Sequence, residues 1–588
     1  MRILGVADGM TGGAALIEDG VIVSAIHEER LVRAKMATGF PRAAIETVLR
    51  STGTKAEEID AIAVATVNEF FRDPAIAYDG WLLREQVPAK ELLLNASSMV
   101  NRVLGAQPFL QQGYYGLKAL LGRKRRRLLR KVLLEEWGFR CPIEFVDHHY
   151  AHACSAYFTS GMPEATVITM DGAGDNCSSA VYRAKGGDLQ KLGSVTSFDS
   201  LGNYYAYITH LCGFKAQKHE GKITGLAAYG KPAYADILRQ FITYEDGRTV
   251  NQGGVFYWAA VRAIERALPQ PFDKADLASS MQQVLEDVGC AYVRSWVDRA
   301  GCPDVAVAGG VFANVKFNQR IHELHNVRSV FVHPGMGDEG LAVGAAYALA
   351  TRHARTAGSP LRPSRLRDVY FGTSYDENEV GQAIRNAGLE TEPVDDIEAR
   401  VAELLASGHV VARLAGRMEY GPRALGNRSI LYQATDPTVN DWLNKRLNRT
   451  EFMPFAPVTL EEHADRCYHN LDGARYSAKF MTITVNCTDW MREQCPAVVH
   501  VDGTARPQLI DRESNPGYYR ILDEYRKRTG LPSLINTSFN MHEEPIVCSP
   551  DDGIRAFLDG TLDYLAIGSF LMRHPRAVPP HSQSAAGS

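Results

Sequence analysis

The chain has 588 residues, and this length predicts two to four domains rather than one. Apolar residues make up 45% and charged residues 22%, a balance that excludes an intrinsically disordered protein. The net charge of −4 argues against a general nucleic-acid-binding protein, and because the chain has no long uncharged apolar run we expect no membrane-spanning helix.

The ten cysteines are scattered along the chain and form no C-x-x-C pair. This pattern predicts reduced thiols rather than a disulfide framework or a zinc finger. The first residues, Met1–Asp8, are typical of a buried strand and not of a secretory leader. We therefore expect a cytoplasmic α/β protein.

Three short strands are predicted at the start of the chain, over Ile3–Ala7, Ala14–Ile17 and Val21–Ile26. A polar turn (8–13) that includes Gly12 joins the first two, and we expect its backbone N–H groups to face phosphate. This opening resembles that of the acetate kinase, sugar kinase, Hsp70 and actin superfamily, whose first hairpin carries a phosphate loop.

A helix is predicted over Ala43–Thr52 and a strand over Ile59–Thr66, followed by a helical insertion over about 73–140. The insertion contains the basic stretch Arg123–Lys131, and no acidic residue occurs from Tyr114 to Lys131. Two interpretations stay open for this stretch: a solvated helix surface, or a docking surface for an anionic partner or lipid headgroups.

Strands and helices alternate through the rest of the chain, as in an α/β protein. The best linker candidate is Ala354–Arg367, rich in Pro, Ser, Arg and Gly, after a helix over Leu341–Thr351. The C-terminal tail, 578–588, is expected to be disordered. The predicted strands are Ile143–Val146, Val167–Met170, Val305–Ala308, Val330–His333, Val410–Leu414, Ile430–Tyr432, Thr482–Val485 and Tyr564–Ile567.

The sequence Asp147-His148-His149-Tyr150-Ala151-His152 contains two histidines four residues apart. On a helix, His148 and His152 lie on one face, at a spacing that lets two imidazoles reach one metal ion. Taken alone, the pair favours a structural or surface role, and a metal site is the alternative interpretation.

Glycines and acidic residues follow three predicted strands, where an open α/β sheet presents ligand-binding groups. These turns are Met170–Asp175, Ala308–Asn314 and His333–Gly340. The last leads into a helix of small residues, whose start favours negative charge and whose glycines let a nucleotide approach the backbone. Each turn alone is compatible with an ordinary tight turn, but several in order favour a nucleotide site.

Arginines gather among glycines in the second half, within Gly416–Ser429. Because the planar arginine side chain suits phosphate and carboxylate, we expect a small anion or a nucleotide phosphate as the ligand. The segments Arg449–Pro457, Thr504–Gln508 and Asn536–Ile546 carry further candidates. Surface salt bridges, the alternative, fit poorly because these residues lie among glycines, prolines and apolar positions.

Together these motifs resemble those of the carbamoyltransferase family that includes the nodulation protein NodU and the antibiotic-tailoring tobramycin and novobiocin carbamoyltransferases. The resemblance spans nearly the whole chain. In order, its motifs are E-E-R (28–30), H-H-x-x-H (148–152), D-G-x-G (171–174), S-L-G (200–202), G-K-x-x-G-L-A-A-Y-G (221–230), G-G-V-x-x-N (309–314), Asp338, G-P-R-A-L-G-x-R-S (421–429), P-F-A-P (454–457) and N-T-S-F-N-x-x-x-E-P-I (536–546).

This resemblance implies a duplicated actin-like first part (1–355) similar to threonylcarbamoyl-transfer (TsaD-like) proteins, a linker (356–366), and a second α/β part (367–577) similar to YrdC-like domains. In the family, the YrdC-like part makes carbamoyl adenylate from carbamoyl phosphate and ATP. The TsaD-like part transfers the carbamoyl group to an acceptor hydroxyl, here expected on a sugar-like or natural-product small molecule. Because carbamoyl adenylate is a labile mixed anhydride, excluding water protects it.

Carried onto this chain, the resemblance implies that His148, His152 and Asp338 hold Fe(2+), a donor set with open positions that suits this metal. ATP and Mg(2+) are the other expected cofactors. The expected nucleotide contacts of the first part are Gly12, Gly172, Lys222, Gly309, Gly310 and Asn314. The expected carbamoyl phosphate and ATP contacts of the second part are Arg417, Arg423 (also expected to be catalytic), Arg428, Ser429, Arg449, Arg506, Asn536, Ser538 and Asn540.

Two family histidines are replaced, by Met10 in the first hairpin and by Met36 after the E-E-R motif. A thioether cannot take a proton at neutral pH, so another group must serve as base or the acceptor must be easily deprotonated. The candidate bases are Asp8, His27 and Asp171. Met10 and Met36 can instead line an apolar acceptor pocket.

Met453 stands where many relatives have arginine, and Lys445 or Arg446 could replace that phosphate contact. Two alternatives to O-carbamoylation stay open: N-carbamoylation of an amine, which needs less help from a base, and a regulatory relative that binds metal and nucleotide without transfer activity. The intact arginine motifs argue against the second. The sequence is compatible with a homodimer and does not identify the acceptor.

Overall fold

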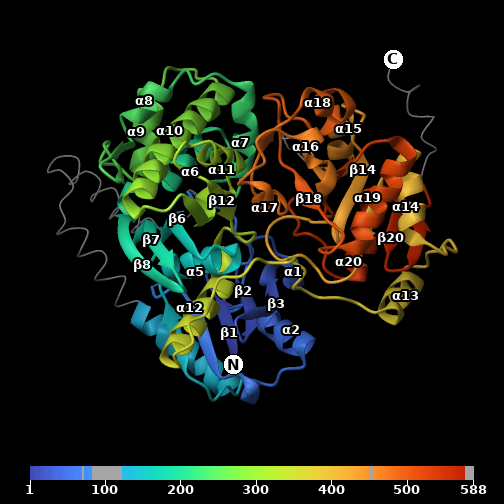
Figure 1. Ribbon diagram of the computed structural model, residues 1–588, viewed down its shortest axis with the longest axis horizontal. Coiled ribbons are helices and arrows are strands. Elements are labelled where there is room, and N and C mark those ends of the chain that lie inside the picture. Colours follow the sequence, from blue (N-terminus) through green and yellow to red (C-terminus); the bar gives the residue numbers. More distant parts are fainter. Residues whose placement is uncertain (69–71, 83–121, 449–454, 577–588) are drawn as a thin grey trace. The chain divides into compact units, whose positions relative to one another are not determined.

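The computed structural model describes residues 1–68, 72–82, 122–448 and 455–576 (Figure 1). They form two compact units. The first consists of Met1–Glu28 and Met36–Leu366, and the second of Glu29–Lys35 and the chain from Arg367 onward. The short segment Glu29–Lys35 therefore belongs to the second unit, which no sequence pattern indicated.

The first unit contains two five-stranded sheets that repeat one topology. In each sheet, three consecutive strands pair antiparallel, and two later strands are added in parallel beside the first of these three. The strand orders are β3-β2-β1-β4-β5 and β8-β7-β6-β11-β12. The expected duplication is thereby confirmed. The strands are β1 Arg2–Ala7, β2 Gly13–Glu18, β3 Val21–His27, β4 Ala61–Ala65, β5 Ile143–Val146, β6 Glu164–Gly174, β7 Cys177–Lys185, β8 Asp188–Thr196, β11 Asp304–Ala308 and β12 Ser329–Val332, with a separate hairpin of β9 Thr243–Glu245 and β10 Arg248–Val250.

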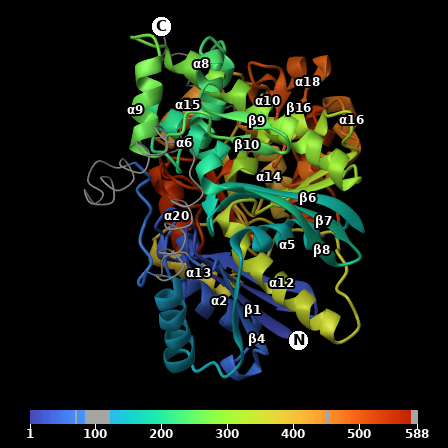
Figure 2. The same cartoon turned by 90° about the vertical axis from the view of Figure 1, so that its left-hand side faces the viewer.

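Helices α5 and α12 lie between the two sheets (Figure 2). α12 packs against β1, β2 and β4, whereas α5 packs against β6, β7 and β11. α2 covers the other side of the first sheet, and α6 and α10 cover the second. The helices of this unit are α2 Arg42–Thr52, α5 His148–Ser160, α6 Leu201–Leu211, α7 Glu220–Leu226, α8 Ala235–Arg239, α9 Trp258–Ala267, α10 Lys274–Ala300, α11 Val315–His322 and α12 Leu341–Thr356; α1, Glu28–Val32, begins here and ends in the second unit.

The two central helices touch at a glycine. A Cβ atom on Gly344 of α12 would lie 1.9 Å from the carbonyl oxygen of Ala151 in α5, closer than any side chain allows. Glycine is therefore required for the helix backbones to approach this closely. The contact fixes the start of α12 relative to the histidine-bearing turn of α5.

The segment predicted as a linker packs on the first unit. Helix α12 extends to Thr356, and Arg365 forms an isolated β-bridge with Ser160. The boundary between the units falls after Leu366.

The basic stretch of the insertion docks onto the first sheet mainly through Arg125, while Arg126 and Arg130 donate to the carbonyls of Val67 (2.7 Å) and Ile143 (3.4 Å). Residues 122–131 are helical, and Arg125 is buried against Asp8, with its Nε donating to Oδ2 at 3.1 Å and its Nη2 donating to Oδ1. The same guanidinium donates to the carbonyls of Thr66 (2.9 Å) and Ala65 (3.2 Å). The expectation of a solvated or docking surface is wrong for Arg125, because its charge is paired inside the unit. Residues 83–121 of the predicted insertion lie outside the described residues.

The second unit is built around a seven-stranded mixed sheet of order β18-β15-β19-β14-β13-β20-β21. α14 and α19 pack together over one side of it around a core that includes Leu405, Leu431 and Tyr518. The strands are β13 Val411–Leu414, β14 Arg428–Gln433, β15 Ala456–Leu460, β18 Gln508–Ile510, β19 Ser533–Ser538, β20 Tyr564–Ile567 and β21 Phe570–Arg573, beside the small pair β16 Val485–Asn486 and β17 Thr504–Ala505.

The helices of the second unit are α13 Glu377–Asn386, α14 Ile397–Ala406, α15 Val439–Arg446, α16 Ala464–Cys467, α17 Arg475–Ala478, α18 Asp489–Gln494, α19 Pro516–Thr529 and α20 Pro550–Asp559. The strand predicted at Thr482–Val485 is wrong for all but its last residue, because the chain turns at Met481, whose φ is +56°. The tail 578–588 lies outside the described residues. None of the described helices is long and apolar enough to cross a membrane.

We expect Arg125→Ala to lower the free energy of unfolding by about 3–5 kcal/mol, because it leaves the Asp8 carboxylate buried without its ion-pair partner. Urea denaturation followed by circular dichroism measures this loss. Arg127→Ala removes an exposed arginine from the same helix and should change the free energy by less than about 0.5 kcal/mol. Equal stability of the two variants would contradict a structural ion pair.

Candidate functional site

Two histidines project side by side from the first turns of α5. The helix starts at His148 because the side chain of Asp147 accepts the N–H group of Tyr150, which caps the helix. His148 and His152 are four residues apart, and their ring centroids lie 4.7 Å from each other. Both imidazoles are buried. The predicted placement on one helical face is confirmed.

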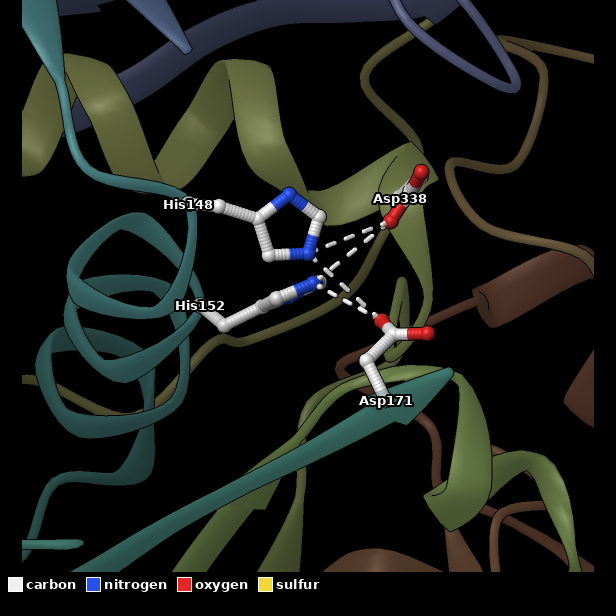
Figure 3. Close-up of side chains that lie close together, drawn as sticks. All are labelled: His148, His152, Asp171 and Asp338. Atoms are coloured by element: carbon white, nitrogen blue, oxygen red, sulfur yellow. Dashed lines mark ion pairs between the residues drawn. The ribbon is translucent and has the colours of Figure 1, made fainter. Parts of the chain in front are cut away.

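Two carboxylates from other elements meet these imidazoles (Figure 3). Asp171 lies near the end of β6, and Asp338 lies just before α12. Asp171 Oδ2 is 3.7 Å from Nε2 of His148 and 3.3 Å from Nε2 of His152. Asp338 Oδ1 lies 3.7 and 3.6 Å from the same two nitrogens. One donor atom from each residue falls within a group whose members are all within 4.8 Å of one another.

The backbone around Asp171 departs from a regular strand in a way that shapes this cluster. The pairing of β6 with β7 is interrupted between Met170 and Gly174, and such a bulge re-aims the side chains within it. A Cβ atom on Gly174 would lie 2.2 Å from the imidazole of His148. The second glycine of D-G-x-G is therefore needed to admit the His148 ring.

Asp175 anchors the histidine helix to the neighbouring strand. One of its carboxylate oxygens accepts the His148 N–H at 2.9 Å and the Val67 N–H at 2.8 Å, and the other accepts the Asn68 N–H at 2.7 Å. A single carboxylate thus holds the start of α5 to the segment that follows β4. No role was predicted for Asp175, although its position at the end of an acid-and-glycine turn marks it as a candidate.

The four side chains fit a metal ion. Within the part of the chain that the structure describes, neither ring nitrogen of His148 or His152 has a hydrogen-bond partner, although all four nitrogens are buried, and buried polar atoms are rarely left in this state. Two imidazoles and two carboxylates form a nitrogen–oxygen donor set of the kind used for iron(II) and similar ions.

The electrostatics of the cluster also favour a positive charge at its centre. Burial lowers the pKa of His148, but Asp171 and Asp338 outweigh this and raise it to about 10. Burial likewise opposes the raised pKa of His152, and the same carboxylates raise it. Burial raises the pKa of Asp171, yet the two imidazoles hold it well below the ordinary value. A cation that binds here would displace protons from the imidazoles.

The three candidate bases, Asp8, His27 and Asp171, lie in different environments in the structure. Asp171 joins the cluster as a potential fourth ligand. Asp8 is buried in the ion pair with Arg125, and burial raises its pKa despite that partner. His27 lies at the end of β3, beside Gly13, and is buried.

Two of the expected nucleotide contacts lie directly beside the cluster. The N–H of Gly172 donates to Asp171 Oδ1 at 2.7 Å, and the N–H of Gly310 donates to Oδ2 at 3.0 Å. Gly309 has a φ of +113°, and a Cβ there would strike the backbone of Met170. These glycines orient the Asp171 carboxylate in this structure.

The other expected contacts of the first unit make different interactions. The Gly12 N–H donates to the Ala37 carbonyl at 2.8 Å, so the expectation that it faces phosphate is wrong for this residue. Asn314 caps α11 and is buried, with its Nδ2 donating to Gln282 at 2.8 Å. Lys222 lies on α7, 6.0 Å from the ring centroid of Phe214.

In the second unit, Glu419 organises the loop 415–427 that joins β13 to β14 and carries predicted arginines. One oxygen of this buried carboxylate accepts the N–H groups of Leu425, Asn427 and Arg428 at 2.9, 2.7 and 3.0 Å. The loop is thereby folded into one conformation. Sequence reasoning missed Glu419, because a carboxylate among arginines gives no local sign that backbone groups are its partners.

Arg428 stabilises this loop by hydrogen bonds to backbone carbonyls. Its guanidinium is fully buried and donates to the carbonyls of Ala415 (3.0 Å), Asn427 (2.9 Å) and Cys548 (3.3 Å). Burial lowers its pKa. These bonds direct the guanidinium at the protein's own backbone, and a contact of Arg428 with phosphate stays a prediction.

Four further predicted contacts also make hydrogen bonds within the unit. They are Arg417 to the Phe371 carbonyl (2.6 Å), Ser429 from the Gly426 N–H (2.9 Å), Asn536 to the Ala424 carbonyl (3.1 Å) and Asn540 to the Met541 carbonyl (2.7 Å).

The remaining predicted contacts are Arg423, Arg506 and Ser538. Arg423 is half-buried in the middle of the loop, and Ser538 ends β19. Arg506 lines a small pocket together with His500 and Thr504, with space for about one water molecule.

Arg449 and Met453 lie outside the described residues. Of the two proposed substitutes for an arginine at 453, Lys445 is exposed on α15, whereas Arg446 lies 3.3 Å from Asp563 and over the ring of Trp442.

Comparisons with known proteins cover both units. The family model "Carbamoyltransferase N-terminus" matches residues 2–347, and "Carbamoyltransferase C-terminus" matches residues 402–574. The nodulation protein NolNO of Sinorhizobium fredii is 33% identical over 97% of this chain and 79% of its own. The nodulation protein NolO of Bradyrhizobium diazoefficiens is 34% identical over 73% of this chain and 79% of its own. Among solved structures, full-length HypF in a phosphate- and nucleotide-bound form is 11% identical, covers 61% of this chain and 47% of HypF, and has a TM-score of 0.35.

We expect His148→Ala and His152→Ala each to lose stoichiometric metal, because each removes one of two nitrogen donors. Metal content after reconstitution with Fe(2+) and desalting measures this. His149→Gln is the matched control: His149 is the adjacent histidine, but its nitrogens lie 2.8 Å from Thr169 Oγ1 and 3.0 Å from the Cys177 carbonyl. Unchanged metal content in the first two variants would exclude these ligands.

Asp171→Asn separates the two roles open to this residue. If Asp171 is a ligand, the loss of its charge should weaken metal binding more than tenfold, as measured by competition with a chelator. Metal binding equal to that of the unmodified chain would remove Asp171 from the ligand set and return it to the candidate bases.

Proposed function

Because the chain belongs to the carbamoyltransferase family, we propose that it transfers a carbamoyl group from carbamoyl phosphate to a small-molecule hydroxyl in an ATP-dependent reaction. The observation that carries the proposal is the cluster of the buried His148 and His152 with the half-buried Asp171 and Asp338 in the first unit. Such a donor set beside an acid-and-glycine turn suits a step in which a carbonyl group must be polarised.

His148, His152 and Asp338 would hold Fe(2+), with Asp171 as a fourth donor. When bound, this ion supplies Lewis acidity to a carbamoyl carbonyl. The chain's own residues prepare the site in three ways: Asp175 fixes the start of the histidine helix, the Gly172 and Gly310 N–H groups orient Asp171, and burial excludes water from the imidazoles.

Activation of the carbamoyl group belongs to the second unit in this proposal. Carbamoyl phosphate, water and ATP give carbamoyl adenylate, phosphate and pyrophosphate, possible only where anionic groups are neutralised and oriented. Arg423, on the loop held by Glu419, and Arg506, beside His500 and Thr504, are the cationic groups that support this assignment. Mg(2+) would share the neutralisation of the ATP phosphates.

A hydroxyl acceptor requires a base in the first unit. His27 is favoured over Asp8, because the Asp8 carboxylate is committed to Arg125 and helps hold the insertion in place. Transfer of label from carbamoyl phosphate to a panel of sugar-like alcohols and matched amines tests this part. Label on amines alone would replace the hydroxyl acceptor with an amine.

The activation half is tested without an acceptor. ATP and carbamoyl phosphate together should release pyrophosphate, whereas ATP alone should not. Binding of both ligands with no release would favour a regulatory protein instead of an enzyme that forms the adenylate.

We expect Arg423→Ala to slow this carbamoyl-phosphate-dependent release by about 30- to 1000-fold, equivalent to about 2–4 kcal/mol of transition-state stabilisation. Single-turnover measurements of pyrophosphate give the rate. Arg385→Ala removes an exposed arginine of α13 in the same unit and should leave the rate unchanged. A normal rate for Arg423→Ala would overturn the role given to this loop.

A further inference from the structure

The E-E-R motif divides between the two units. Glu28 belongs to the first unit, where its carboxylate accepts the N–H groups of Ala43 (3.1 Å) and Ala44 (2.7 Å) at the start of α2. From Glu29 to Lys35 the chain belongs to the second unit. Neighbouring residues of one motif thus have separate structural roles. The proposed reaction assigns no role to Glu29 and Arg30, the residues of the motif that belong to the second unit.

Arg30 is buried within the second unit and is tied to the arginine-bearing loop. Its side chain is 3% exposed, its Nε lies 3.3 Å from Glu29 Oε1, and its Nη2 donates to the Gly421 carbonyl at 3.0 Å. Gly421 has a φ of +97°, and the next residue, Pro422, has no N–H group to donate. Arg30 therefore holds the loop at a point where the loop's own backbone lacks an N–H donor, at Pro422.

This anchor lies two residues from Arg423. On the other side of Arg423, the Ala424 carbonyl accepts a hydrogen bond from Asn536 at 3.1 Å. The backbone that carries Arg423 is thus held at Gly421 by Arg30 and at Ala424 by Asn536. Removal of either bond frees one end of this four-residue span, Gly421–Ala424.

Arg33 connects segment 29–35 to the loop around Pro545, which joins β19 to α20. Its two terminal nitrogens donate to the carbonyls of Ile546 (2.7 Å) and Pro545 (2.8 Å), and its Nε lies 3.2 Å from Asp552. Pro545 and Ile546 end the motif that begins at Asn536. Segment 29–35 therefore holds both loops that carry the predicted anion contacts.

We propose that Arg30 and Arg33 are positioning residues for carbamoyl activation, acting through the backbone of the loops around Gly421 and Pro545. The inference rests on the proposed function, which assigns activation to the second unit. A displacement of about 1 Å in a charged group is enough to cost a large part of its effect on a transition state. The N-terminal segment is thereby part of the activation apparatus without contacting the reacting atoms.

Single-turnover pyrophosphate release across a range of carbamoyl phosphate concentrations tests this in the full-length chain. We expect Arg30→Ala to lower the maximal rate at least tenfold and to raise the half-saturating concentration. Arg30→Lys should recover most of the rate, because lysine can still donate to the Gly421 carbonyl. Arg33→Ala should show a smaller loss of the same kind. Arg50→Ala, an exposed arginine of α2, is the control and should match the unmodified chain.

Iron content and the urea midpoint separate positioning from simple stability. Positioning predicts that both stay near the unmodified values in Arg30→Ala while the rate falls; if this variant fails to fold, Arg30→Gln, which keeps one donor, should show the same loss. An unmodified rate for folded Arg30→Ala, or a rate that falls only in proportion to the folded fraction, would overturn the inference while leaving the proposed function intact. No release by the unmodified chain would overturn the proposed function, and this inference with it.

Discussion

The close approach of α5 and α12 at Gly344 is the constraint on which the site of the first unit depends. The two histidines lie on the first turns of one helix, and Asp338 immediately precedes the other. Had the residue at 344 carried a Cβ atom, the backbones would be forced apart where Ala151 now touches it, between His148 and His152 in sequence. The donor set is therefore a consequence of backbone packing, and the side chains only complete it.

The repeated topology explains why these elements meet. In each half, three antiparallel strands are continued by two parallel ones, and the helix that follows the fifth strand packs toward the other half's sheet. α5 follows β5 but packs on β6, β7 and β11, whereas α12 follows β12 but packs on β1, β2 and β4. Ligand groups from both halves are thereby delivered to one place, and neither half alone contains the full donor set. The bulge after Met170 then turns Asp171 toward the same point.

Local patterns in the sequence were sufficient for the strands of the first sheet and for the spacing of the two histidines, because each depends on period or spacing. The duplication was implied only by the family resemblance, and strands β7 and β8 were not predicted. Local patterns could not identify partners distant in the chain. In the sequence Arg125 is one more charge in a basic stretch, but its burial against Asp8 is a contact between residues 117 positions apart. Asp171 was identified as a reactive carboxylate, yet its place beside the imidazoles required the register of β6. For the same reason the membership of Glu29–Lys35 in the second unit had no sequence signal.

The arginines of the second unit show why residue type alone does not assign a role. Arg428 and Arg423 belong to one motif but have different roles. Arg428 donates its hydrogen bonds to backbone carbonyls of the protein, whereas Arg423 lies on a stretch of loop that hydrogen bonds of this kind hold in place. A guanidinium buried without a carboxylate partner is costly, so its retention at 428 requires a benefit, and the benefit is a loop with one conformation. Glu419 and Arg30 also hold this loop in one conformation: the carboxylate accepts backbone N–H groups, and the guanidinium donates to a backbone carbonyl. In the proposed reaction, which must neutralise several phosphates at once, cations that are fixed in advance are the most effective, and much of the charge in this motif is used for that fixing.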